Sequence, residues 1–256
     1  MSQRDDGQRR ATLRAEFECV RGYWSPLWDS VLDLDPDYFE AYLRFSEVPW
    51  RTGALTPKVK ELLYVAVDAV TTHLYEPGLR IHIRNALALG ASEAEIMEVL
   101  ELCTLIGLES GPFGAALQLD EAQALGLGTG PAAGDEDRLD ALALDFEVRY
   151  GGWSPGLRAL AAIDPDYVAT TLALVDAATS SGALDEATVQ LVLLAANASV
   201  THADPVRARV HIRRALRAGA GVRDVLEVLQ LAAVLGVHTL VIGVPILVDE
   251  VAQRAR

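Results

Sequence analysis

Apolar residues recur at helical intervals through much of this chain, and capping residues mark where helices begin. In the segment LTPKVKELLYVAVDAV, Thr56 suits the N-cap position and Pro57 suits the first helical turn. Four apolar residues of this segment fall on one helical face: Leu62, Val65, Ala66 and Ala69. The pattern predicts a helix from about residue 57 to the end of the apolar run.

Other start and stop signals predict further helices. The segment DPDY offers an Asp N-cap and a Pro in the first turn, and Pro77 opens a helix that ends near Gly90. Ser92 and Glu95 have the spacing of a capping box. The segment LVIGVPILV has a strand-like composition, but its helical surroundings favour a buried helix. We therefore predict an all-α fold.

The pattern of predicted helices occurs twice along the chain. Residues 17–122 align with residues 146–251 without a gap, and THLYEPGLRIHIRNALALGA corresponds to THADPVRARVHIRRALRAGA. A period this long indicates a duplicated domain rather than a solenoid of short repeats. We predict two tandem helical domains, 17–122 and 146–256, joined by a Gly-, Ala- and Asp-rich linker over 123–145. Residues 1–16 are expected to be disordered or irregular.

Charge and composition narrow the possible partners and locations. The formal net charge is -14, which argues against nucleic acid and anionic membranes, because phosphate groups are bound by clustered Lys and Arg. The first residues contain no apolar secretory core. No apolar run approaches the ~18 residues that suggest a membrane span, and Asp68 interrupts the run around it, so we expect no span. We predict a soluble cytoplasmic protein that acts on a small molecule.

Four of the five histidines form two pairs with the same nine-residue spacing: His73 with His82, and His202 with His211. The first of each pair lies at the end of one predicted helix, and the second lies within the next helix. A short connection folds two such helices back on each other, so the two imidazoles could share a pocket. Because imidazole titrates near neutrality, it can move a proton in either direction. All four are candidate acid–base residues.

Arginines flank the second histidine of each pair and could bind a substrate carboxylate. Arg80 and Arg84 lie around His82, and Arg209 precedes His211. A guanidinium holds a carboxylate bidentately. Structural interpretations stay open: the histidines could be helix-end dipole partners or hydrogen-bonded core residues, and the arginines could be surface charges. The nine-residue spacing is not the i, i+4 pair that brings two ligands together on a helix, so no metal site is predicted.

The segment KELLYVAVDAVTTHLYEPGLRIHIRNALALGASEAEIMEVL resembles the carboxymuconolactone decarboxylase and alkylhydroperoxidase D superfamily. The shared elements are the KEL helix, the helix with the pattern H…AL..GA, and the EIMEVL helix, and they recur more weakly in the second copy. The resemblance implies the helical fold of that superfamily. It also implies assembly of small subunits into trimers or hexamers, so a homo-oligomer, favoured as a trimer of double-domain chains, is expected.

The residues exclude one activity of this superfamily. Its peroxidase branch carries C-x-x-C with a histidine four residues beyond the second cysteine. In this chain other residues stand at the two cysteine places of each copy: Tyr75 and Gly78, Asp204 and Arg207. Thiol peroxidase chemistry needs a low-pKa thiolate and a resolving partner. Cys103, on the next helix, supplies neither, so the protein is not expected to be a thiol peroxidase.

The decarboxylase branch lacks the cysteine pair and, by resemblance, uses the glutamate of the KEL segment together with the histidine. Here that glutamate is Glu61, whereas the second copy has Gln190, which cannot act as a general base. Either the two copies are unequal, with the first competent, or one composite site draws on both.

The resemblance therefore implies a cofactor-independent lyase of the decarboxylase type, acting on a small carboxylated, cyclic substrate. Arg80 would hold a carboxylate, His82 would transfer the proton with Glu61 beside it, and His73 would be a second acid–base group. An isomerase or a lactone hydrolase would use the same residues. A non-catalytic member of the fold would instead bind a ligand or a partner.

Overall fold

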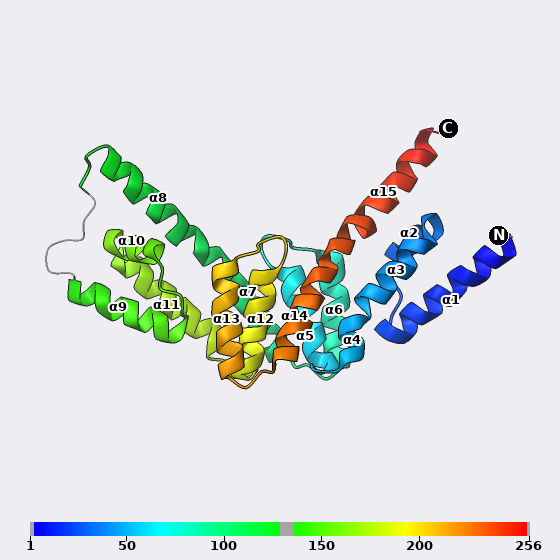
Figure 1. The fold of residues 1–256 in the computed structure, drawn as a ribbon, viewed down its shortest axis with the longest axis horizontal. Helices are drawn as coiled ribbons and strands as arrows, with labels where there is room; N and C mark the ends of the chain where they lie inside the picture. The colour runs from blue at the N-terminus through cyan, green and yellow to red at the C-terminus, as the bar shows by residue number, and fades with distance from the viewer. Residues whose placement is uncertain (1–2, 129–135, 255–256) are drawn as a thin grey trace. The chain divides into compact units, whose positions relative to one another are not determined.

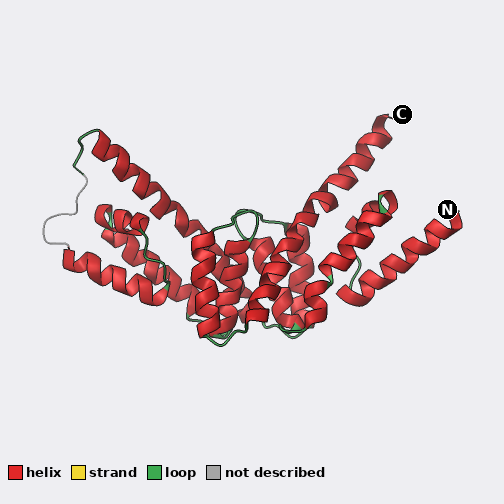
Figure 2. Cartoon of the chain, in the orientation of Figure 1, coloured by secondary structure: helices red, strands yellow, loops and turns green. Residues whose placement is uncertain are grey.

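The computed structural model describes residues 3–128 and 136–254 (Figure 1). Within these residues every regular element is a helix and no strand occurs (Figure 2). The prediction of an all-α fold is therefore confirmed. The segment LVIGVPILV, which has a strand-like composition, lies inside the last helix, α15 (His238–Arg254).

The chain divides into two compact units. The terminal unit comprises Met1–Ala54 and Ala233–Arg256, and the middle unit comprises Leu55–Ala232. Besides α15, the helices of the terminal unit are α1 (Gln3–Arg21), η1 (Pro26–Trp28), α2 (Asp29–Leu34), α3 (Pro36–Ser46), α4 (Val48–Thr52) and η3 (Val234–Val237). The helices of the middle unit are α5 (Pro57–Ala69), α6 (Glu76–Ala88), α7 (Glu93–Thr104), η2 (Leu105–Glu109), α8 (Ser110–Ala124), α9 (Glu136–Arg149), α10 (Pro155–Ile163), α11 (Pro165–Thr179), α12 (Glu186–Ala198), α13 (Pro205–Arg217) and α14 (Val222–Ala233), whose last residue passes the boundary.

The duplication in the sequence is reproduced helix by helix. Helices α5, α6 and α7 have the same lengths as their counterparts α12, α13 and α14, at equivalent positions of the two repeats. The loops repeat as well, since Leu74 and Ala203 both have a positive φ, of 48° and 51°. Gly90 ends α6 with a φ of 85°, and Gly219 takes the equivalent place after α13. Glycine favours this left-handed conformation because it has no Cβ.

Capping side chains begin the helices where the sequence predicted. The carboxylate of Asp35 accepts a hydrogen bond from the backbone N–H of Tyr38 at 2.9 Å. Ser92 and Glu95 form the predicted capping box, with hydrogen bonds of 3.1 Å and 2.7 Å. A side-chain cap of this kind stabilises a helix by about 1 kcal/mol.

The last helix of each repeat packs against an early helix of the other repeat. Within the middle unit, α8 of the first repeat contacts α10 of the second, and within the terminal unit, α15 of the second repeat contacts η1 and α2 of the first. Since α10 is the counterpart of η1 and α2 together, the exchange is reciprocal. The predicted boundaries 17–122 and 146–256 therefore mark repeats, and they do not mark the compact units.

The prediction of an irregular N-terminus was wrong for the residues that the structure describes, because they form α1. Leu13 and Phe17, one helical turn apart, are buried. The ring of Phe17 lies 5.5 Å from that of Trp28 and 5.9 Å from that of Phe39. Tertiary packing thus stabilises a helix whose charged local sequence gives little sign of it. Part of the predicted linker 123–145 lies outside the described residues, and the rest includes the end of α8 and the start of α9.

The expectation that no apolar run is long enough to span a membrane was also wrong. The helical segment Val222–Arg254, comprising α14, η3 and α15, is long and apolar enough by length and composition. Core helices of water-soluble proteins pass the same test, and Val225, Val228 and Leu231 of α14 are buried. Length and composition alone therefore do not place this segment in a membrane.

Two buried glutamates of the middle unit bind the backbone at the start of the opposite repeat's central helix. Glu98 on α7 accepts hydrogen bonds from the N–H of Leu184 at 2.9 Å and from the hydroxyl of Ser181 at 2.6 Å. Glu227 on α14 accepts one from the N–H of Leu55 at 2.9 Å. Their exposures are 1% and 2%. These bonds fix the loops before α12 and α5, the helices that carry the candidate site residues.

Candidate functional site

The candidate site of the first repeat is built around a buried glutamate–histidine pair. Glu61 on α5 and His82 on α6 bring Oε2 and Nδ1 within 2.6 Å of each other. Because a carboxylate accepts hydrogen bonds, the N–H at Nδ1 donates the hydrogen bond and Glu61 accepts it. The other ring nitrogen, Nε2, is then the atom that can take up or release a proton. Two of the predicted catalytic residues thus form one unit.

Asp68 lies on the other side of the same imidazole. Its Oδ2 is 4.0 Å from Nε2 of His82. Burial, followed by the negative charge of Glu61, raises the pKa of Asp68 to about 8. At neutral pH this side chain is therefore a protonated acid that can donate to a nearby atom. The site combines a potential base, His82, with a potential acid.

The sequence analysis missed Asp68, although a signal was present. Asp68 was interpreted only as an interruption of an apolar run. It stands seven residues after Glu61, which is almost two full helical turns, so both carboxyl groups lie on one face of α5. A charged residue at that spacing inside a buried helix is a recognisable pattern.

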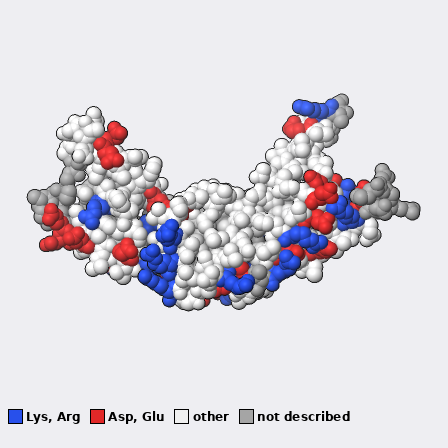
Figure 3. Space-filling model, viewed as in Figure 1, with Lys and Arg blue, Asp and Glu red and all other residues white. Residues whose placement is uncertain are grey.

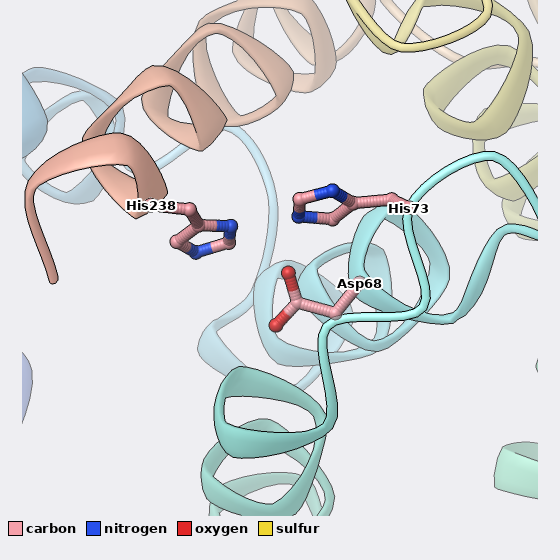
Figure 4. Close-up of side chains that lie close together, drawn as sticks. All are labelled: Asp68, His73 and His238. Atoms are coloured by element: carbon pink, nitrogen blue, oxygen red, sulfur yellow. The ribbon is translucent and has the colours of Figure 1, made fainter. Parts of the chain in front are cut away.

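His73 and Tyr64 complete the surroundings of this pair. An oxygen of Asp68 and a ring nitrogen of His73 lie within 4.8 Å of each other (Figure 4), and the ring of Tyr64 stacks on His82 at 4.5 Å. Burial lowers the pKa of His73, which favours its neutral form. Figure 4 also labels His238, which begins α15 in the terminal unit. Carboxylate oxygens and imidazole nitrogens are common metal ligands, so the expected lack of a metal stays a prediction.

The three predicted substrate-binding arginines lie at the surface. The side chain of Arg80 is 74% exposed and donates two hydrogen bonds to Glu76, at 2.6 Å and 2.8 Å. Arg84 and Arg209 are exposed as well, and basic side chains gather over α13 in Figure 3. Residues two positions apart on a helix do not share a face. Arg80 and Arg84, two positions before and after His82, therefore point away from the Glu61–His82 pair.

The equivalent positions of the second repeat have different chemistry. Nδ1 of His211 lies 2.9 Å from Oε1 of Gln190, and Asn197 stands where the first repeat has Asp68. Burial, together with the positive charge of Arg207, lowers the pKa of His211 to about 3. His211 is therefore a neutral imidazole at physiological pH, and its hydrogen-bond partner is the amide of Gln190. His202, the remaining predicted acid–base residue, is half-buried in the loop after α12.

A buried arginine is a further difference between the two repeats. Arg207 corresponds to Gly78 and is 3% exposed. It donates hydrogen bonds to the carboxylate of Glu109 and to the carbonyl of Gly151, the latter at 2.7 Å, and its guanidinium lies 4.5 Å from the ring centre of Tyr150. These partners are far from Arg207 in the chain, so no local pattern predicted the cluster.

Gly78 is required in the first repeat because Asp68 fills the adjacent space. A Cβ at this position would lie 2.2 Å from Oδ2 of Asp68 and 2.7 Å from the ring of Tyr75. We expect Gly78→Ala to lower the free energy of unfolding by about 1–3 kcal/mol, measured by urea denaturation. The control is Gly107→Ala, where an added Cβ meets nothing within 4 Å. Equal stability of Gly78→Ala and the unmodified protein would contradict this packing.

The family model described as the carboxymuconolactone decarboxylase family matches residues 36–109 and 165–239, once in each repeat. The chain belongs to the carboxymuconolactone decarboxylase family. The duplication is thus a tandem duplication of this family's domain, and the resemblance inferred from the sequence is confirmed.

A solved structure agrees with this assignment over nearly the whole chain. It is the 1.70 Å crystal structure of a candidate gamma-carboxymuconolactone decarboxylase subunit from Burkholderia xenovorans LB400, with 34% sequence identity and a TM-score of 0.87. The match covers 96% of this chain and 98% of that one. Among curated proteins, none matches this member of the carboxymuconolactone decarboxylase family.

Proposed function

We propose that this protein is a cofactor-independent lyase that decarboxylates a small carboxylated, cyclic substrate by proton transfer in the first repeat. The observation that supports this most is the buried Glu61–His82 pair: Oε2 and Nδ1 are 2.6 Å apart, and Oδ2 of Asp68 lies 4.0 Å from Nε2 of His82. The similarity to a candidate decarboxylase subunit supports the choice of reaction.

The proposed decarboxylation needs a proton donor and uses no cofactor. When a β-keto-acid-like group loses CO₂, the carbon–carbon bond breaks and its electron pair remains on the substrate, delocalised into the neighbouring carbonyl. The carbon then takes up a proton, which His82 or the protonated Asp68 delivers and water later replaces. Glu61 holds the imidazole in orientation through its contact with Nδ1. His73 serves as the second acid–base group.

The surface position of the arginines limits their part in this proposal. Because Arg80, Arg84 and Arg209 face away from the Glu61–His82 pair or lie exposed, the proposal gives them no role in holding the substrate carboxylate. His202 and His211 of the second repeat have no carboxylate at the place of Glu61. The proposal therefore assigns turnover to the first repeat.

An isomerase is the second candidate function. His82 as the base and the protonated Asp68 as the acid can remove a proton from one carbon of the substrate and return one to another carbon, with no change in mass. The proximity of Asp68 to His82 favours this reaction as well as decarboxylation. A lactone hydrolase, the remaining possibility, would add one water to its substrate.

One screen separates these functions. Carboxylated lactones and β-keto acids are incubated with the protein, and CO₂ release and product mass are measured. Loss of CO₂ supports the lyase, rearrangement at constant mass supports the isomerase, and gain of water supports the hydrolase. If none of these compounds reacts, the catalytic proposal fails and a non-catalytic, ligand-binding role takes its place.

The activity should not depend on sulfur. Cys103 is buried and its burial raises the thiol pKa to about 12, so it holds no thiolate at neutral pH. We expect the double variant Cys19→Ser and Cys103→Ser to keep most of the turnover of the unmodified protein. If the double variant loses its turnover while its far-UV circular dichroism spectrum is unchanged, a cysteine takes part in the reaction and this prediction is wrong.

We propose that the chain forms a homo-oligomer, with three chains favoured, and that it works in the cytoplasm without nucleic-acid or membrane partners. Helix α15 supports assembly because it exposes the large apolar side chains of Ile242, Ile246 and Leu247. Light scattering should report about three times the chain mass of 27.5 kDa. A monomer mass at micromolar concentration would contradict assembly.

A further inference from the structure

The middle unit contains a cavity that the proposed reaction does not use. Its volume is about 650 Å³, and it is lined by η2 and α8 of the first repeat and by the starts of α10 and α13 of the second. A large part of its wall is apolar, including Ile106, Phe113 and Leu117. Cavities of roughly 300–1,000 Å³ with mainly apolar walls are typical of small-molecule sites.

The charged groups that line this cavity are already paired with each other or with the backbone. Arg207 donates to Glu109 and to the carbonyl of Gly151. Asp204 caps α13 by accepting hydrogen bonds from the N–H groups of Val206 and Arg207, at 2.8 Å and 3.0 Å. An anionic ligand would meet two carboxylates and no unpaired cation among these groups. The cavity therefore favours a neutral ligand.

One residue that lines the cavity has a buried polar atom in need of a partner. His202 lines the cavity, and its Nε2 is buried without a hydrogen bond to any residue that the structure describes. A buried polar atom without a partner destabilises the fold. A ligand with a hydroxyl or amide group would supply the missing hydrogen bond.

We propose that this cavity is a non-catalytic binding site for a neutral, mainly apolar small molecule with one hydrogen-bonding group, such as a phenol, that pairs with Nε2 of His202. The ring of the ligand packs against the apolar wall. Because Arg207 and Glu109 are already paired with each other, a charged analogue finds no partner there. The lack of a carboxylate beside His211 leaves such a ligand unchanged. The site is separate from the Glu61–His82 pair, and its test requires no turnover.

Three phenols of different charge test this site by ligand-observed NMR titration of the full chain: p-cresol, 4-hydroxybenzoate and tyramine. We expect saturable binding of neutral p-cresol and affinities at least about tenfold lower for the anion and the cation, because charge must be desolvated without gaining a partner. His202→Phe keeps an aromatic ring but removes the ring nitrogens. It should lower the affinity for p-cresol about fivefold, because one hydrogen bond is lost.

A matched pair of glycine variants locates the binding. Gly107 lines the cavity and Gly114, on α8, does not, and an added Cβ meets nothing within 4 Å at either position. Gly107→Leu should place its side chain in the cavity and lower p-cresol affinity at least about tenfold, whereas Gly114→Leu should leave it unchanged. The proposal is overturned if p-cresol does not bind saturably, if both variants weaken it equally, or if 4-hydroxybenzoate binds more tightly.

Discussion

Replacing His82 by alanine should lower turnover by about 10²–10⁴-fold, the usual cost of losing one positioned acid–base group, whereas His211→Ala should keep most of it. The reason is the difference between the two partners. Glu61 lies 2.6 Å from His82 and carries a charge that can hold or share a proton. Gln190, 2.9 Å from His211, offers only an amide. The comparison is made with steady-state kinetics on a substrate from the screen.

Controls for folding decide how these variants are interpreted. Both histidines are buried, and removing a buried hydrogen-bonded group destabilises by roughly 1–3 kcal/mol, so unfolding must be measured in each. Glu61→Gln gives the first repeat the residue of the second and should lower turnover while leaving the imidazole in place. Equal losses in His82→Ala and His211→Ala would refute unequal repeats and favour a composite site. No loss in either would remove the histidines from the mechanism.

Asp68→Asn should abolish a pH dependence of stability of about 1.4 kcal/mol per pH unit. Burial raises the pKa of Asp68 from 3.8 to about 8, so between these values the folded protein holds a proton that the unfolded chain has released. The stability contributed by Asp68 is therefore complete below about pH 4, decreases as the pH rises, and is lost above about pH 8. The unfolding free energy of the unmodified protein should fall relative to that of the variant across this window.

Urea unfolding of both proteins between pH 5 and 9 measures this difference. Asparagine should be accommodated, since Asn197 occupies the equivalent position of the second repeat and donates to the carbonyl of Leu193 at 2.8 Å. The control is Glu61→Gln, which removes the charge that contributes to the raised pKa and should move the upper limit of the window to lower pH. A stability difference that does not change with pH would show that Asp68 is not a protonated acid at neutral pH.

Local sequence signals were sufficient for the helices but not for the way they pack. The caps at Asp35 and Ser92 and the left-handed Gly90 act within a few residues, and each was predicted in place. Helix α1 depends on Leu13 and Phe17 packing against residues of other helices. The reciprocal exchange of α8 and α15 likewise depends on contacts between the repeats, which helical periodicity does not encode.

The candidate site shows the same limit. Glu61 was named by resemblance and His82 from the repeated histidine spacing, and the structure brings them together. The helical spacing was enough to place Asp68 beside Glu61 and to turn Arg80 away from His82, because positions seven apart share a face and positions two apart do not. The Arg207–Glu109 pair joins residues 98 positions apart, and only the folded chain reveals it.

The most direct test of proton transfer at His82 follows deuterium from solvent into the product. A carboxylated substrate from the screen is converted in D₂O, and mass spectrometry counts the deuterium at the carbon that lost CO₂. We predict one deuterium per CO₂ released by the unmodified protein and by His211→Ala, and a loss of both products in His82→Ala. CO₂ release by folded His82→Ala at the unmodified rate would contradict the assignment of the reaction to this site.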